Sequence, residues 1–526
     1  MGVVGLFSVL LRNYPVAFVN DQNQAALALD TIYLDGNALL YPIAEVTKIP
    51  EEIGKSLLQV SQLYADKYRC PCSIYMDGPA HMGKVRQQRL RRFLYDPTAV
   101  ILTQSTEIGE RKGEVPISTV ARSSILGIDV PTITEWSPAM FTPGTEMMER
   151  IHLYIEEHLG EYTGIDIYSS FHEPGEGEHK IIQHIKNSSR NRSSQSPYRA
   201  GIVGKDADLL LLGMSITIGE GWNVQPYIIR HNDRIGEGGI SNGYTPDHPI
   251  YTVDCSLLRE RILGSFQVPN DGTIGATSIW DFILATFIVG NDFFPAIPET
   301  KNIYDIVPLI LAISPNLYNS ENQSINWIGF KNFIFVLADT ISTNSGIRGA
   351  AYINWLQLPS VGKDEREIKH NKIRSAGEIS LESFEELYYF HVSSFGINID
   401  GMILAWLTTV QWIFLYYHQG MESASIAWQY PLHFSPTLST LISSPVFDDI
   451  NTGDRILGLS TRRVLPITPV QALAAVLPVW LHNLIPIETR EKLQNIPQYY
   501  PYAFQVLKST GDPIIPIIPY EVISSL

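Results

Sequence analysis

Short apolar runs that end at an aspartate recur in the first half of the chain. One such run precedes each of Asp35, Asp77 and Asp206, and a helix-like segment follows each of these acids. Strands that alternate with helices predict an α/β fold with a mostly parallel central sheet and flanking helices. Because the ligand site of such a sheet lies beyond the carboxyl ends of its strands, the three acids are predicted to converge at one edge.

The second half of the chain has longer apolar stretches, near 403–417 and 473–481. Polar residues or a proline interrupt both stretches, so we expect buried helices there rather than membrane spans. This pattern predicts a largely helical C-terminal part at 377–526. A segment rich in glycine and charge at 341–376 predicts a linker between that part and an N-terminal domain at 1–340.

Composition predicts a compact body. Of the 526 residues 45% are apolar and 17% are charged, against roughly 25% charged in an average domain. The net charge of −16 disfavours nonspecific coating of nucleic acid, which needs excess cations, but it leaves room for a local basic pocket. Three cysteines form neither a disulfide framework nor a zinc array, so we expect a reducing compartment. The cytoplasm is the expected location, with a viral origin left open.

Further carboxylates gather in three motifs. Glu176 and Glu178 precede an apolar helix face, Asp208 follows Asp206 by two residues, and Asp292 follows another apolar run. Each of these acids alone is explained as a helix cap or a turn residue, and that alternative is favoured for any single one. The complete set of acids predicted to converge is Asp35, Asp77, Glu176, Glu178, Asp206, Asp208 and Asp292.

Converging carboxylates repel one another unless protons or bound cations relieve the repulsion. Ligands that offer only oxygen suit Mg²⁺ or Mn²⁺ rather than zinc. Two such ions about 3.5–4 Å apart can activate a water and stabilise the leaving oxygen in phosphodiester cleavage. The sequence has no Gly-rich phosphate loop with Lys-Ser/Thr, so nucleotide hydrolysis by that route is not indicated.

A basic segment follows Asp77. Residues 81–92 contain five lysines and arginines and no acid. At helical spacing Lys84, Gln88 and Arg91 fall on one stripe, with Arg92 beside them. Such a row can hold a phosphate group, and a merely solvated helix face is about equally favoured. Metal-binding acids beside a phosphate-holding helix predict a nuclease that recognises a terminal phosphate.

The motifs together resemble the XRN family of 5′→3′ exoribonucleases. The resemblance extends in order over almost the whole chain, and the motif at 174–180 is the strongest. In the N-terminal part it rests on YLDGN at 33–37, DGPA at 77–80, KVRQQRLRRF at 84–93, PGEGEHK at 174–180, DAD at 206–208 and GNDFFP at 290–295. In the C-terminal part it rests on QW at 411–412, YY at 416–417, YP at 430–431, HFSP at 433–436 and the stretches at 469–478 and 499–504.

The resemblance implies a core like that of PIN and flap nucleases, in which the seven acids are the catalytic, metal-binding ligands of two Mg²⁺ or Mn²⁺ ions. It implies that Lys84, Gln88, Arg91 and Arg92 hold the 5′-monophosphate of a single-stranded RNA. The family stacks the first bases between a His and a Trp; Tyr41 stands at the His position here, and the Trp is expected to be Trp428, which the sequence also allows as a core aromatic. The C-terminal part is expected to pack on the nuclease domain and complete the RNA channel.

The expected activity is therefore 5′→3′ degradation of 5′-monophosphorylated RNA to mononucleotides. We expect a compact form of the family that consists of the catalytic body, with no membrane partner. One alternative is a nuclease-derived structural or RNA-end-binding protein without turnover. Another is a related flap or DNA exonuclease, which the C-terminal motifs argue against.

Overall fold

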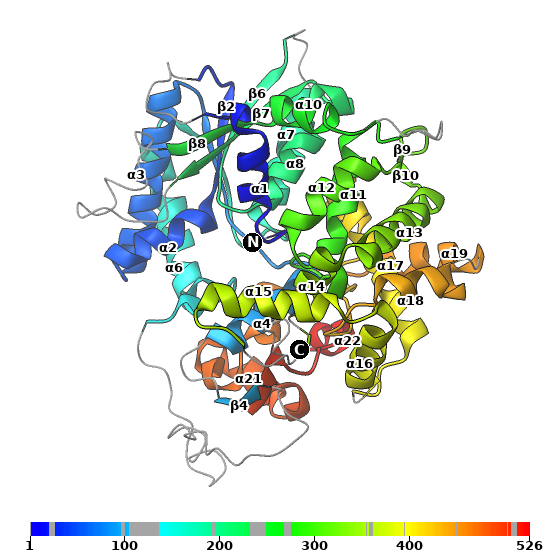
Figure 1. Ribbon diagram of the computed structural model, residues 1–526. Helices are drawn as coiled ribbons and strands as arrows, with labels where there is room; N and C mark the ends of the chain where they lie inside the picture. Colours follow the sequence, from blue (N-terminus) through cyan, green and yellow to red (C-terminus); the bar gives the residue numbers. More distant parts are fainter. Residues whose placement is uncertain are drawn as a thin grey trace.

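The computed structural model describes most of the chain (Figure 1). The described residues are 2–19, 27–95, 100–104, 136–190, 196–231, 249–267, 275–353, 355–356, 361–393, 395–447, 450–501, 503–506 and 513–526.

A seven-stranded sheet forms the centre of the N-terminal part, in the order β1-β8-β7-β6-β2-β3-β5. The five strands from β7 to β5 in this order are parallel, and β8 runs antiparallel to both β7 and β1. The predicted mostly parallel sheet is thereby confirmed. The strands are β1 (Phe18–Val19), β2 (Thr31–Asp35), β3 (Cys72–Tyr75), β5 (Ile165–Ser169), β6 (Tyr198–Val203), β7 (Val224–His231) and β8 (Pro249–Asp254).

Helices cover both faces of this sheet, and β2 shows how the sequence separates the two faces. Ile32 and Leu34 belong to one apolar core, whereas Tyr33 belongs to the other. Side chains alternate between the two faces of a strand, so both faces must be apolar for helices to pack on each. The first core includes α2 (Gly36–Val46), α3 (Pro50–Tyr68) and α6 (Glu146–His158). The second includes α1 (Leu6–Asn13), α7 (Gly177–Arg190), α8 (Asp208–Ser215), α10 (Cys255–Leu263), α11 (Ile279–Thr286), α12 (Ile303–Ile313) and α13 (Trp327–Thr343).

The C-terminal part is largely helical, as predicted. Its small sheet joins β11 (Ala503–Val506) and β12 (Pro513–Ile514) to β4 (Val100–Gln104) of the N-terminal part. Its helices are α16 (Leu381–Ser393), α17 (Ile399–His418), α18 (Leu438–Ser443), α19 (Ile450–Ser460), α20 (Pro469–Val476), α21 (Ile487–Leu493) and α22 (Tyr520–Ser524). Before it in the chain come a two-stranded sheet of β9 (Tyr318–Asn319) and β10 (Ser324–Ile325) and the helices α14 (Ser345–Tyr352) and α15 (Glu365–Gly377).

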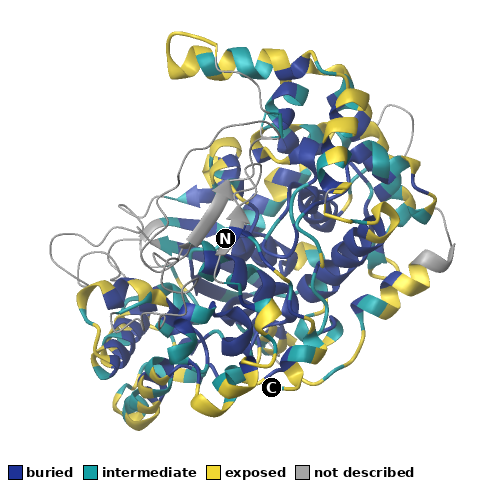
Figure 2. Ribbon diagram, turned by 90° about the horizontal axis from the view of Figure 1, so that it is seen from below, coloured by how far each residue is buried: buried dark blue, intermediate teal, exposed yellow. Residues whose placement is uncertain are grey.

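Helix α17 runs through the interior of the protein. Among the described residues it is the one helix of sufficient length and apolarity to cross a membrane, and 83% of its most apolar window is buried inside the protein. That burial is typical of a core helix, as the interrupted apolar pattern predicts. Buried residues concentrate in the middle of the molecule and exposed ones at its rim (Figure 2).

The two halves of the chain share one core. Residues of α17 belong to the same apolar cluster as α8 and α11, and α20 packs against α4 (Met82–Tyr95). The segment predicted as a linker, 341–376, contains α14 and most of α15, which pack against each other. The division at 1–340 and 377–526 stays a prediction about sequence organisation, because the apolar core is continuous across it.

Candidate active site

The carboxyl ends of three neighbouring parallel strands bring the first acids together. Asp35 is the last residue of β2 and pairs in register with Tyr75, the last residue of β3. Asp77 follows β3 by two residues, and Asp206 follows β6 by three. Since β2 lies between β3 and β6, the fold places these acids at one edge of the sheet.

Backbone hydrogen bonds hold Asp35 and Asp77 in place. Asp35 caps α2, its Oδ1 accepting from the amide of Ala38 at 3.3 Å. Asp77 accepts from the amide of Gly177 at 2.7 Å, which ties the end of β3 to the start of α7. At Gly177 a Cβ atom would lie 2.9 Å from the carbonyl oxygen of Tyr75, so this close approach requires glycine.

The start of α7 carries the next two acids, one directly before the helix and one in its first turn. Glu176 and Glu178 are buried, and one ligand atom of each lies within 4.8 Å of the other and of one from His179. A helix N-terminus stabilises negative charge, which explains part of this placement. Three potential ligand atoms this close together also form a group that could hold a metal ion.

Asp208 begins α8 and is 2% exposed. Its Oδ1 atom has no hydrogen-bond partner among the described residues. At Gly2 an added Cβ would lie 1.7 Å from this same atom, so the N-terminal segment lies directly against the carboxylate. A buried carboxylate oxygen without a donor from the protein is suited to bind a metal ion.

Lys84 lies inside the acid cluster. Its Nζ atom is 2.5 Å from Oε1 of Glu176 and 2.8 Å from Oδ2 of Asp292. Burial opposes the charged form, but Asp292 and Glu176 outweigh burial and hold the pKa of Lys84 well above its usual value. The ammonium group therefore stays charged and binds two of the predicted acids to α4.

The remaining cations of α4 surround the same place. Nη2 of Arg91 lies 3.5 Å from Oδ1 of Asp292, and Nη2 of Arg92 donates to Oγ1 of Thr142 at 3.1 Å. Both guanidinium groups are partly exposed. The helix thus presents two accessible forked donors next to the carboxylates.

One cavity of about 380 Å³ unites most of the predicted site. Both carboxylates and side chains of α4 line it. Of the predicted residues it is lined by Asp35, Tyr41, Asp77, Lys84, Gln88, Arg91, Arg92, Glu176, Glu178 and Asp206. Asp292 adjoins it through Lys84 and Arg91, and Asp208 adjoins it through the shared turn with Asp206.

The two predicted stacking aromatics occupy different surroundings. Tyr41 is 40% exposed, lines the cavity and contacts Phe141 edge-on at 5.4 Å between ring centroids. Trp428 does not line this cavity; it packs against the large apolar core, and its Nε1 donates to Oγ1 of Thr409 at 3.1 Å. Trp428 is half-buried, so its role in stacking on RNA stays a prediction beside the alternative of a core aromatic.

Burial and the charges of neighbouring groups shift the pKa values of the acids in the cluster. Burial, followed by the neighbouring carboxylates, raises the pKa of Asp35 and of Glu178 well above its usual range. Burial and then Asp292 raise the pKa of Asp208 to about 7. For Asp292 burial acts in the same direction, but Lys84 and Arg91 outweigh it and hold the pKa below its usual value. The single charge of Lys84 does not neutralise the seven acids. A cluster with this many carboxylate oxygens is suited to bind divalent cations.

Two tyrosines from α17 complete the surroundings, and sequence reasoning assigned them no role. The hydroxyl of Tyr416 donates to Oε2 of Glu176 at 3.0 Å. The hydroxyl of Tyr417 is hydrogen-bonded to Asp208. The side chain of His179 stacks on Tyr416 at 3.8 Å between ring centroids. The YY motif at 416–417 is part of the family resemblance, and it was the sequence signal from which a role for these two tyrosines could have been predicted.

Asn37 and Lys205 are also cavity residues that sequence reasoning did not name. Oδ1 of Asn37 accepts from the amide of Asp77 at 3.0 Å and so links the ends of β2 and β3. Lys205 stands directly before the DAD motif and adds a cation to the wall.

Comparison with known proteins agrees with this geometry. Residues 1–222 match the model of the XRN 5′-3′ exonuclease N-terminus. The 5′-3′ exoribonuclease 1 of Homo sapiens is 24% identical over 96% of this chain, and the match covers 32% of the human protein. The 5′-3′ exoribonuclease 2 homolog of Drosophila melanogaster is 23% identical over 96% of this chain and 68% of its own length. The 5′-3′ exoribonuclease 1 of Schizosaccharomyces pombe is 27% identical over 63% of this chain and 25% of its own length.

The chain spans about a third of the length of the human relative. Among solved structures, the catalytic core of Rad2 in complex with a DNA substrate aligns over 73% of this chain and 98% of that one, with a TM-score of 0.31 and 12% identity. The family match at 1–222 and the relatives that align with nearly the whole chain support an XRN family exoribonuclease.

Proposed function

We propose that this protein is a divalent-metal-dependent 5′→3′ exoribonuclease that degrades 5′-monophosphorylated single-stranded RNA to mononucleotides. The observation that carries the proposal is one cavity that is lined both by carboxylates and by the cations of α4. The relatives named 5′-3′ exoribonuclease support RNA as the substrate.

The seven predicted acids are the residues that would hold Mg²⁺ or Mn²⁺, with two ions as the proposed number. When bound, such ions supply an activated water and stabilise the leaving oxygen of a phosphodiester. The protein's own part is to hold the carboxylates in place. The backbone amide of Gly177 donates to the carboxylate of Asp77, and that of Ala38 donates to Asp35. The hydroxyl of Tyr416 donates to the carboxylate of Glu176.

The cations of α4 are proposed to select the end of the RNA. Arg91 and Arg92 offer forked donors that match phosphate oxygens, and Gln88 adds an amide on the same helix face. A 5′-monophosphate placed there brings the first phosphodiester toward the acids. A triphosphate or a cap at the same end would need room beyond the monophosphate, so we propose that such ends are excluded.

Tyr41 is proposed to stack on a base of the RNA. Its ring lines the cavity and is exposed, and a base–aromatic stack contributes about 1–3 kcal/mol. A phenol ring offers the same kind of face as the imidazole that the family has at this position. Binding is therefore proposed to survive the replacement of His by Tyr.

A second candidate function is an RNA-end-binding or structural protein without turnover. The observation that favours it is the pairing of Lys84 with both Glu176 and Asp292, in which one ammonium group binds two of the acids without any metal. In this case the cations of α4 would still bind a 5′-phosphate, but no product would form.

One assay separates the two functions. Single-stranded RNA with a 5′-monophosphate, a 5′-hydroxyl or a 5′-triphosphate is incubated with the protein and Mg²⁺, with EDTA as control. The exonuclease proposal expects mononucleotides from the monophosphate RNA in Mg²⁺ alone. Equal degradation of all three RNAs would refute end selection, and protection of the RNA without cleavage would support the second function.

A further inference from the structure

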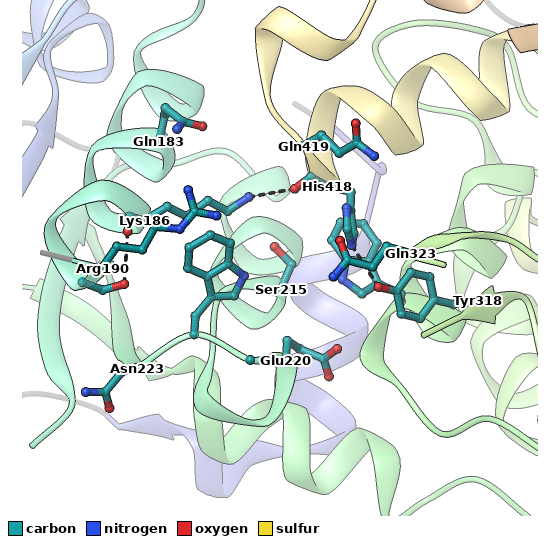
Figure 3. Close-up of a pocket in the computed structure, with 14 residues that line it drawn as sticks. Gln183, Lys186, Arg190, Ser215, Glu220, Asn223, Tyr318, Gln323, His418 and Gln419 are labelled. Atoms are coloured by element: carbon teal, nitrogen blue, oxygen red, sulfur yellow. Dashed lines mark hydrogen bonds between the residues drawn. The ribbon is translucent and has the colours of Figure 1, made fainter. Parts of the chain in front are cut away.

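A second cavity lies at the far end of α7 from the acid cluster. It has a volume of about 540 Å³ and is lined by α7, the turn after α8, the β9–β10 hairpin and the end of α17 (Figure 3). Glu178 and Arg190 lie twelve residues apart on α7, roughly 18 Å along the helix axis. None of the residues predicted for the active site lines this second cavity.

Two cations and an indole occupy one side of this cavity. Nζ of Lys186 lies 5.1 Å from the ring centroid of Trp222, and Cζ of Arg190 lies 4.5 Å from it. Lys186 and Arg190 are one helical turn apart on α7, so both side chains reach the same face of the cavity. Figure 3 shows them side by side.

No acid among the described residues balances the charge of Lys186. Lys186 is 4% exposed, and no described carboxylate forms an ion pair with it or with Arg190. Burial and then Arg190 lower the pKa of Lys186 to about 8. In a chain with a net charge of −16, two neighbouring cations without a counter-ion form an isolated positive site. A buried charge of this kind is unfavourable unless a partner compensates it.

The acid that does line this cavity is already engaged. Oε1 of Glu220 is 2.7 Å from Nη2 of Arg259, and Oε2 accepts from Oγ of Ser278 at 2.7 Å. Glu220 also accepts from the amide of Ile279 at the start of α11. The carboxylate of Glu220 is therefore bound by these three neighbours and forms no ion pair with Lys186 or Arg190.

A structural role explains part of this arrangement. Nζ of Lys186 donates to the carbonyl oxygen of His418 at 2.9 Å, at the C-terminus of α17, where a cation is favourable. That contact uses one of three ammonium protons and does not involve Arg190. Nδ1 of His418 is buried and has no hydrogen-bond partner among the described residues. The site therefore retains donor capacity that the fold itself does not use.

The other walls carry groups that suit a planar polar ligand. Side-chain amides of Gln183, Gln323 and Gln419 and the hydroxyl of Ser215 line the cavity together with the indole. Amides and aromatic faces are the groups that hold nucleobases, and lysine and arginine are those that hold phosphate. The volume lies within the range of about 300–1,000 Å³ that is usual for small-molecule sites.

We propose that this cavity binds a nucleoside phosphate, with the phosphate held by Lys186 and Arg190 and the base held by Trp222 and the surrounding amides. The ligand has two possible sources. It is either a 5′-mononucleotide of the kind that the proposed reaction releases or a free nucleoside triphosphate. Of these two sources, only the released mononucleotide depends on the proposed function.

Calorimetric titration of the whole protein in EDTA tests this proposal, with adenosine 5′-monophosphate, adenosine 5′-triphosphate and inorganic phosphate as probes. We expect saturable binding of a nucleotide, with a Kd below about 1 mM. Tighter binding of the monophosphate assigns the mononucleotide source, and tighter binding of the triphosphate assigns the free nucleotide. Binding of neither nucleotide would overturn the proposal.

The variants locate the bound nucleotide. Arg190→Gln changes an exposed cation and should weaken the binding at least about tenfold, because a charge-assisted hydrogen bond is lost. Arg150→Gln, the matched control, removes an exposed arginine that pairs with Glu51 far from the cavity and should leave the Kd unchanged. Unchanged affinity in Arg190→Gln, or loss of affinity in Arg91→Gln instead, would overturn the proposal by placing the nucleotide elsewhere. Lys186→Met should also weaken nucleotide binding. Its thermal melting curve shows whether the variant is still folded, so that a loss of binding can be told from a loss of folding.

Discussion

The hydroxyl of Tyr416 donates a hydrogen bond to Oε2 of Glu176 at 3.0 Å, across 240 residues of sequence. Oε1 of the same carboxylate is bound by Lys84. A helix from the C-terminal part and a helix from the N-terminal part thus fix the two oxygens of one acid. The orientation of Glu176 depends on both halves of the chain, which explains why the C-terminal part is needed at a site whose acids all lie in the N-terminal part.

Tyr416→Phe removes one of these hydrogen bonds and keeps the ring. A hydrogen bond to a charged group contributes about 1.5–3 kcal/mol, so we expect activity to fall about tenfold or more. Because Tyr416 acts by positioning Glu176, the Mg²⁺ concentration for half-maximal activity should rise as well. Steady-state cleavage measured across a Mg²⁺ titration provides both values.

Tyr500→Phe is the matched control for that experiment. Its hydroxyl is buried and donates to the carbonyl oxygen of Ala474 at 2.9 Å, in a different apolar cluster. It should lower thermal stability slightly and leave the Mg²⁺ dependence unchanged. A Tyr416→Phe protein with wild-type Mg²⁺ dependence would contradict the positioning role.

Asp208→Asn should abolish cleavage and retain RNA binding. It removes the charge of a buried carboxylate whose Oδ1 has no donor among the described residues, whereas the cations that we propose to bind the RNA end lie on α4. Filter binding and cleavage of the same labelled RNA measure the two properties separately. Asp254→Asn alters a helix cap at the start of α10 and should leave cleavage intact. Cleavage retained in Asp208→Asn would remove this acid from the catalytic set.

The raised pKa of Asp208 predicts a pH-dependent stability of the metal-free protein. The folded protein binds a proton at Asp208 up to about pH 7, whereas an unfolded chain releases it near the ordinary aspartate value of about 3.9. Between these two values the folded state holds more protons, so the unfolding free energy decreases as pH rises. Asp208 thus contributes stability at low pH that is lost as pH passes through about 7.

Urea unfolding in EDTA across pH 4 to 8 measures this slope. Asp208→Asn should reduce the slope and raise stability at the upper end, because the buried charge is gone. Added Mg²⁺ should also raise stability at the upper end, since a metal requires the ionised carboxylate. A slope that is equal in wild type and variant would show that Asp208 does not carry the effect.

Much of this site follows from the sequence because parallel strands place their carboxyl ends at one edge. Asp35, Asp77 and Asp206 could be predicted to converge from three apolar runs alone. The pairing of Lys84 with Asp292 could not be predicted, since it depends on how α4 packs against a turn 208 residues later. The helical spacing of the basic residues in α4 predicts which cations share one face of the helix. It does not predict which residues that face contacts.

The tyrosines of α17 were missed for a related reason. Sixteen of its twenty residues are buried, from Met402 to Tyr417, so no amphipathic pattern distinguishes the side that faces the acids. For Trp428 the sequence allowed either stacking on RNA or a core role. Its half-buried indole donates to Thr409 and packs against the core, and stacking on RNA stays a prediction.

Arg91→Gln should weaken the preference for a 5′-monophosphate. Arg91 is partly exposed at the cavity, and its loss removes a forked donor from the proposed phosphate site. We expect the ratio of cleavage rates for monophosphate and hydroxyl RNA to fall about tenfold. Arg374→Gln, an exposed helix position on α15, should keep the wild-type ratio. An unchanged ratio in Arg91→Gln would contradict the assignment of α4 to the RNA end.

Whether the carboxylates hold divalent cations is tested most directly by anomalous diffraction from crystals soaked in Mn²⁺. The expected result is strong anomalous density among Asp35, Glu176, Asp206 and Asp208, with loss of that density in Asp208→Asn. Crystals in which Mn²⁺ is absent from this cluster, with Lys84 still bound to Glu176 and Asp292, would contradict the metal-dependent mechanism and favour a protein that binds RNA ends without cutting them.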